Sequence, residues 1–135
     1  MTTENTNSFK SPDKKHGFDF IFEGEIRFGP EFYTLNLDGK KIQNRIFGDV
    51  FMWHPESTFL ALQEWLTIDY KNGPVTALTL INLDNNKIAR ISKADKGFIS
   101  PIRFENGYII FRKKYLATGE NIEYEIKLDD IKNWE

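Results

Sequence analysis

A seven-residue pattern that occurs twice, 46 residues apart, constrains the fold of this chain more than any other feature. Residues 36–42 read N-L-D-G-K-K-I and residues 82–88 read N-L-D-N-N-K-I, so both fit the pattern N-L-D-x-x-K-I. A weaker third copy, Leu128-Asp129, begins 45 residues after Leu83. Repeats of this length are typical of folds that use one small structural unit several times.

Each period contains signals for short strands, and helical periodicity is nearly absent. The first copy includes Asp38-Gly39, a pair typical of tight hairpin turns because both positions need positive φ. Residues 59–69 are apolar on both parities, which predicts a strand buried on both faces. Residues 122–128 alternate apolar and charged side chains, which predicts a strand with one solvent face. The sequence therefore predicts an all-β fold, an antiparallel meander of about ten strands in three units.

One of these units resembles a known family pattern. Residues 53–61 read W-H-P-E-S-T-F-L-A and resemble the W-S-P-D-[GS]-x-x-[IL]-A stretch that opens the inner strands of TolB-like and WD-like β-propeller blades. His54 stands where that motif has Ser, and the third unit keeps only Ser100-Pro101. The resemblance implies blade-like units of about four strands. Because a closed propeller needs at least about four blades, three units would form an open arc, roll into a barrel or sandwich, or complete a propeller by oligomerisation.

Length and composition indicate one domain. A chain of 135 residues with 40% hydrophobic residues can bury one sizeable core, and we assign residues 17–135 to a single β domain. Residues 1–16 are polar apart from Met1 and Phe9, which predicts a flexible leader. No apolar run is long enough to span a membrane and no secretory signal is present, so we expect a cytoplasmic protein. A net charge of −2 argues against binding to nucleic acid or to an anionic membrane.

Few residues could carry catalytic or metal chemistry. The chain has two histidines and no cysteine, too few for a zinc site, and it lacks the glycine-rich motifs that hold phosphate. His54 and Ser57 could suggest a base and a nucleophile, but in the propeller-like motif these positions form a turn. We therefore predict that the protein is not an enzyme and needs no cofactor and no metal.

Charge and aromatic residues favour binding to another protein. Residues 119–135 carry a local charge of −4, which could steer a basic partner. Tyrosines beside charged or turn residues are candidates for surface anchors. The predicted partner-binding residues are Glu120, Glu123, Glu125, Asp129, Asp130, Tyr33, Tyr70 and Tyr115.

Two functions are consistent with these features. In size and composition the chain resembles the small immunity proteins with which bacteria neutralise their own toxins, and this resemblance implies direct binding to a toxin domain, for example a basic nuclease. The alternative is a lipid-like ligand held inside a β-barrel, because about ten strands with many inward aromatic residues would suffice for one.

Overall fold

The computed structural model describes residues 8–26, 29–69 and 71–135, and these form eleven strands and one short 3₁₀ helix. The predicted all-β class is confirmed, since every strand pairing is antiparallel and no α-helix occurs in the described part of the chain. The elements are β1 (Ser8–Lys10), β2 (Gly17–Glu25), β3 (Glu31–Leu37), β4 (Lys40–Lys41), β5 (Ile46–Trp53), β6 (Phe59–Trp65), β7 (Val75–Asn82), β8 (Lys87–Asp95), β9 (Gly97–Glu105), β10 (Tyr108–Tyr115), β11 (Asn121–Lys127) and η1 (Leu128–Asp130).

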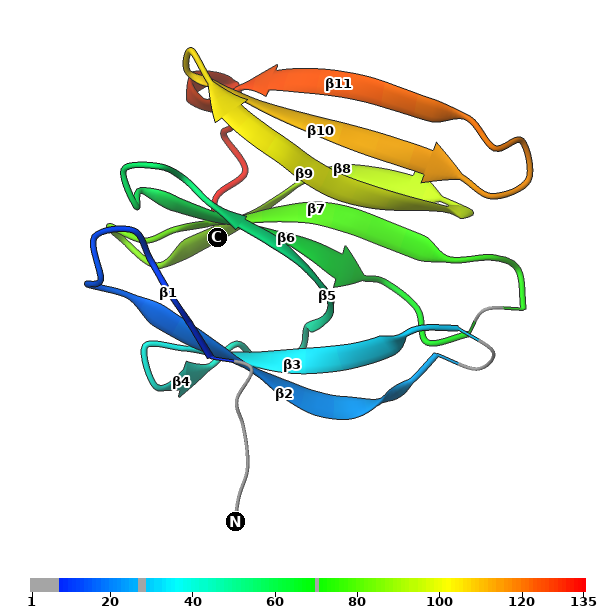
Figure 1. Ribbon diagram of the computed structural model, residues 1–135, viewed down its shortest axis with the longest axis horizontal. Helices are drawn as coiled ribbons and strands as arrows, with labels where there is room; N and C mark the ends of the chain where they lie inside the picture. The colour runs from blue at the N-terminus through cyan, green and yellow to red at the C-terminus, as the bar shows by residue number, and fades with distance from the viewer. Residues whose placement is uncertain (1–7, 27–28, 70) are drawn as a thin grey trace.

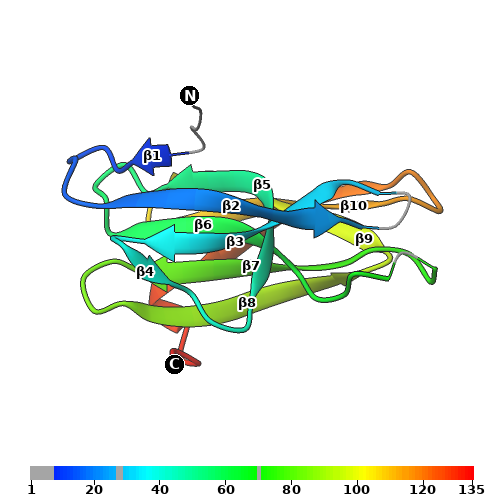
Figure 2. The same ribbon diagram turned by 90° about the horizontal axis from the view of Figure 1, so that it is seen from below.

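The strands form two sheets that stack as three layers (Figure 1). The larger sheet has the order β1-β2-β3-β5-β6-β7-β8, with β4 paired to β3, and the smaller has the order β11-β10-β9. Only one residue pair, Tyr33 and Phe47, joins β3 to β5 in the ladder, and the larger sheet folds over at this point. As a result β2 and β3 lie under β6 and β7, while the smaller sheet lies above them (Figures 1 and 2). The sheets do not close into a barrel.

Strand β6 is buried on both faces, as its sequence predicts. Leu60 and Leu62 point into a core shared with β2 and β3, where they join Phe18 and Phe20. Ala61 points the opposite way, into a second core shared with the smaller sheet. The remaining members of this second core are Leu78, Leu80, Ala89, Ala94, Ile99, Ile109, Phe111 and Ile131. The two cores place β6 and β7 at the centre of the molecule.

Both copies of the repeated pattern form hairpin turns, but the predicted grouping into three blades is not confirmed. The first copy joins β3 to β4, with positive φ at Asp38 and Gly39, and the second joins β7 to β8, with positive φ at Asn86. The third copy lies at the start of η1 and forms no hairpin. The pairing of β3 with β5 also merges the first two predicted units into one sheet.

Part of the predicted flexible leader belongs to the fold. Residues 8–10 form β1, which pairs with the start of β2, so Phe9 lies opposite Phe18. The Phe9 ring also lies 4.6 Å from that of Phe51, centroid to centroid, and closes one side of the first core. Phe9 explains why residues 8–10 are ordered in the sheet although the surrounding segment is polar. Its ring removes apolar surface from water when it packs on the first core. Residues 1–7 lie outside the described part of the chain.

Buried polar side chains attach the smaller sheet to the larger one. The Thr76 hydroxyl on β7 donates a hydrogen bond to the Gly97 carbonyl and accepts one from the Ile99 amide, both at 2.9 Å. The Gln63 amide nitrogen on β6 donates to the Ile99 carbonyl at 3.0 Å. Gly48 leaves room for this amide, since a Cβ at that position would lie 2.2 Å from Gln63 Oε1. These side-chain contacts satisfy backbone groups on the outer edge of β9, where the ladder contains no further strand.

Replacing Thr76 should therefore weaken the attachment between the sheets. A Thr76→Val substitution keeps the shape of the side chain but leaves the Ile99 amide and the Gly97 carbonyl buried without this partner. We expect the free energy of unfolding to fall by about 1–3 kcal/mol, measured by urea denaturation. The control, Thr118→Val, removes an exposed hydroxyl that accepts the Glu120 amide at 3.2 Å in the turn before β11; because water can replace this partner, it should cost less than about 0.5 kcal/mol. Equal losses in the two variants would contradict the role of Thr76.

Candidate binding surfaces and a buried carboxylate

The predicted acidic residues near the C-terminal end are all exposed, but they do not form one patch. Glu123 and Glu125 lie on β11, Glu120 lies in the turn before it, and Asp129 and Asp130 lie in η1 after it. At about 3.3 Å per strand residue, the two ends of this series are roughly 25–30 Å apart. A single compact partner group could not contact all five.

Basic residues on the neighbouring strands offset part of this negative charge. Glu123 lies opposite Arg112 in the ladder, so both side chains are on the outer face of the smaller sheet. Glu125 lies opposite Ile110, which in turn lies opposite Arg103 on β9. The local charge of −4 is therefore a property of the sequence segment, and the sheet face that it helps to form has mixed charge.

The predicted tyrosines are divided between distant parts of the molecule. Tyr115 lies at the end of β10, where its amide donates to the Glu120 carbonyl at 2.9 Å. Burial raises the pKa of Tyr115, and the neighbouring Tyr124 and Glu120 add to this effect. Tyr33 lies on β3, in the opposite outer layer (Figure 1). Tyr70 lies outside the described residues.

Tyr33 belongs to a small surface that we call the Tyr33 patch, made of Phe22, Glu31, Tyr33 and Asp49. Phe22 is 56% exposed, the second highest value among the exposed large hydrophobic side chains of the described residues. Its ring meets that of Tyr33 edge-on, with 6.3 Å between centroids, and Tyr33 also contacts the buried Phe20 ring at 5.2 Å. The Tyr33 hydroxyl donates a hydrogen bond of 2.8 Å to the Glu31 carboxylate. The half-buried Tyr33 thus joins the exposed Phe22 ring to the core.

Negative charge surrounds the aromatic pair. Burial, the hydrogen bond to Glu31, and the charges of Glu31 and Asp49 together raise the pKa of Tyr33 to about 12. Glu25 lies directly opposite Glu31 in the ladder and adds a third carboxylate at this end of the hairpin. Of the patch, the sequence predicted only Tyr33. Phe22 follows Phe18 and Phe20 at the same period-two spacing, but its ring is exposed, whereas those two rings are buried in the first core.

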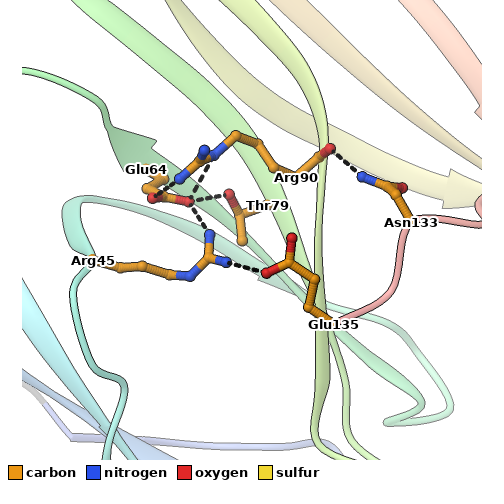
Figure 3. Close-up of polar contacts among 6 residues, drawn as sticks. All are labelled: Arg45, Glu64, Thr79, Arg90, Asn133 and Glu135. Carbon is orange, nitrogen blue, oxygen red and sulfur yellow. Dashed lines mark hydrogen bonds and ion pairs between the residues drawn. The ribbon is translucent and has the colours of Figure 1, made fainter.

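A buried carboxylate lies near the centre of the larger sheet (Figure 3). Glu64 on β6 is 2% exposed, and one of its oxygens accepts hydrogen bonds from Thr79 Oγ1 at 2.7 Å and Arg45 Nη1 at 2.8 Å. Its other oxygen accepts from Arg90 Nη2 at 2.6 Å. A carboxylate so deeply buried is stable only when charged or polar partners replace water, and here two guanidinium groups and a hydroxyl do so.

The same two arginines connect the C-terminal segment to the sheet. Arg45 Nη2 lies 3.9 Å from the Glu135 carboxylate, and the Asn133 side chain donates to the Arg90 carbonyl at 3.0 Å (Figure 3). Glu135 also exchanges two backbone hydrogen bonds with Ile88, on the edge of β8. The Glu64 carboxylate is shielded from solvent and already accepts four hydrogen bonds, so we assign this network a structural role and not a ligand-binding one.

Several hollows in the described surface are open grooves beside loops and strand ends. One groove, with a volume of about 620 Å³, borders Arg45 and is also lined by Lys41, Trp65 and Ile68. The side chains of the two cores lie between the layers. Because the two sheets do not close into a barrel, the described residues do not form the barrel in which the predicted lipid-like ligand would lie.

His54 and Ser57 have separate partners. The His54 ring accepts the Glu56 amide at Nδ1, at 3.0 Å, while the Ser57 hydroxyl accepts the Asp13 amide at 3.0 Å. Ser57 has positive φ and its amide bonds back to the His54 carbonyl, so the two residues form the predicted turn. Within the described ranges, no group of three or more His, Cys, Asp or Glu side chains could hold a metal ion.

Comparisons with protein-family models, with curated proteins and with solved structures found no match to this chain. In the part of the chain that the structure describes, no helix is both long and apolar enough to cross a membrane.

Removing the negative charge of Glu64 should destabilise the fold. A Glu64→Gln substitution keeps the size of the side chain but removes the buried counter-ion of Arg45 and Arg90, and it leaves Arg45 with the exposed Glu135 carboxylate at 3.9 Å. We expect the free energy of unfolding to fall by about 2–3 kcal/mol in chemical denaturation, because one of the two arginines is largely buried. Glu135→Gln, on an exposed carboxylate of the same network, should cost less than about 0.5 kcal/mol. A loss for Glu64→Gln no larger than that control would show that the buried charge needs no counter-ion.

The partly buried His54 should make stability depend on pH. Burial lowers the pKa of this imidazole below 6.5, while the Glu56 carboxylate acts in the opposite direction. The unfolded chain then binds the proton more readily than the folded chain, so stability is lost as the pH falls below about 6.5. Urea denaturation between pH 7.5 and 5.5 should show the wild type losing stability relative to His54→Asn, whose side chain does not titrate there. A constant difference across this range would contradict the assignment.

Proposed function

We propose that this protein is a non-catalytic binding module that docks a basic protein through the Tyr33 patch. The observation that carries the proposal is the exposed Phe22 ring, which contacts the half-buried Tyr33 next to the carboxylates of Glu31 and Asp49. Exposed aromatic rings attached to a rigid core are typical anchors of protein interfaces. A lysine or arginine side chain placed over these rings would gain a cation–π contact and a nearby carboxylate.

The immunity role is the form of this function that we favour. An immunity protein needs a rigid surface that covers its toxin and has no need of an active site of its own. The packed cores on both faces of β6 provide such rigidity, since the patch is attached to one of them through Phe20. A basic toxin domain, such as a nuclease, would supply the complementary charge.

Calorimetry with the toxin encoded by the adjacent upstream gene tests the proposal. We expect nanomolar binding by the wild type, and binding at least about tenfold weaker, about 1.4 kcal/mol, for Phe22→Ser and for Glu31→Gln/Asp49→Asn. The double variant should also bind with a smaller salt dependence, because two steering charges are gone.

The matched control is Glu56→Gln/Asp84→Asn. It also removes two negative charges, but from exposed turns, one beside His54 and one after β7. The net charge therefore changes by the same amount while the Tyr33 patch stays intact. Its affinity should remain within about twofold of the wild type. Equal weakening by both double variants would assign the effect to net charge and would contradict a role for the patch. Absence of binding to the neighbouring gene product would contradict the immunity role.

A further inference from the structure

The outer edge of β11 offers backbone groups for another strand. This strand is the last in the order β11-β10-β9, and it is seven residues long. The other edge of the smaller sheet, β9, exchanges hydrogen bonds with Thr76, and the β8 edge of the larger sheet is partly covered by Glu135, which pairs with Ile88. Strand β2 is partly covered by β1. An uncovered edge of this length is a ready template for strand addition.

The hydrogen bonds at the two ends of β11 show which backbone groups face outward. The Leu128 amide bonds the Gly107 carbonyl, and the Tyr115 amide bonds the Glu120 carbonyl, both at 2.9 Å. The register between these ends contains no bulge, so even-numbered residues of β11 bond to β10. The amides and carbonyls of the odd-numbered residues, Glu123 and Glu125 among them, therefore point to the open side.

The two faces of this edge differ in chemistry. Side chains of odd-numbered residues lie on the outer face, where Glu123 and Glu125 are exposed. Side chains of even-numbered residues lie on the inner face, where Tyr124 is 38% exposed and stacks on Phe111, and Ile126 packs on the second core. An added strand would place alternate side chains beside the carboxylates and the others beside the Tyr124 ring.

We propose that the β11 edge receives an extended segment of another protein in which basic residues alternate with apolar ones. The basic residues lie opposite Glu123 and Glu125 and pair with their outward backbone groups, while the apolar residues extend the cover of Tyr124. The same carboxylates disfavour pairing with a second copy of β11, since antiparallel pairing of two such edges would bring like charges together. This site lies in the opposite outer layer from the Tyr33 patch and does not depend on it (Figure 1).

A capped heptapeptide of alternating lysine and valine tests the site on the full-length chain. Hydrogen exchange followed by NMR should show the Glu123 and Glu125 amides slowing by about tenfold or more in saturating peptide. The already bonded amides of Ile122 and Tyr124 should change far less. A heptapeptide of alternating glutamate and valine should bind at least about tenfold more weakly.

Two variants decide whether the edge and its charges act as proposed. Glu123→Lys/Glu125→Lys should reverse the preference between the two peptides. Glu125→Pro removes one outward amide without removing a bond to β10, so it should weaken binding of the lysine peptide while the unfolding midpoint stays near that of the wild type. Unchanged exchange at Glu123 and Glu125, or an unreversed preference in the lysine variant, would overturn the proposal.

Discussion

The burial of β6 and β7 on both faces is the constraint on which the rest of the structure depends. A strand whose two faces are both apolar must be covered twice, and a sheet of a single layer cannot do this. Leu60 and Leu62 require cover on one side, and Ala61 with Leu80 requires it on the other. The chain before β6 supplies the first cover and the chain after β8 supplies the second. Three layers follow from the two-sided pattern of one central hairpin.

Polar side chains within these buried strands decide how the outer layers are placed. Apolar packing alone tolerates small shifts between layers, whereas a buried hydrogen bond has a narrow range of distances. Gln63 and Thr76 fix the edge of β9, and Glu64 fixes the guanidinium groups of Arg45 and Arg90. Because each of these groups would be costly to bury alone, a shifted arrangement would lose several hydrogen bonds together. These contacts therefore restrict the placement of the layers more narrowly than apolar packing alone would.

Local patterns in the sequence predicted the elements that depend on neighbouring residues. Period-two alternation predicted β11, two-sided hydrophobicity predicted β6, and Asp38-Gly39 predicted the first hairpin. Contacts between distant segments were not predictable in this way. Arg45 and Arg90 lie 19 and 26 residues from Glu64, so no spacing rule connects the three. The single pairing of Tyr33 with Phe47, which merges the first two predicted units, has no local signal either.

The candidate surfaces show the same division between local and distant information. The run of acids at the C-terminal end was visible in the sequence, but the charges beside it come from β9 and β10, which the register brings alongside. At Tyr33 the sequence shows no run of acids, because Glu31 and Asp49 lie on separate strands, β3 and β5. Their shared effect on Tyr33 arises only when the fold brings these strands together. For β11 this changes what its carboxylates can do. On the sheet face, where the charges are mixed, the carboxylates of β11 contribute little net field. At the edge they lie next to outward-facing backbone amides, where they would favour an incoming strand that carries positive charge.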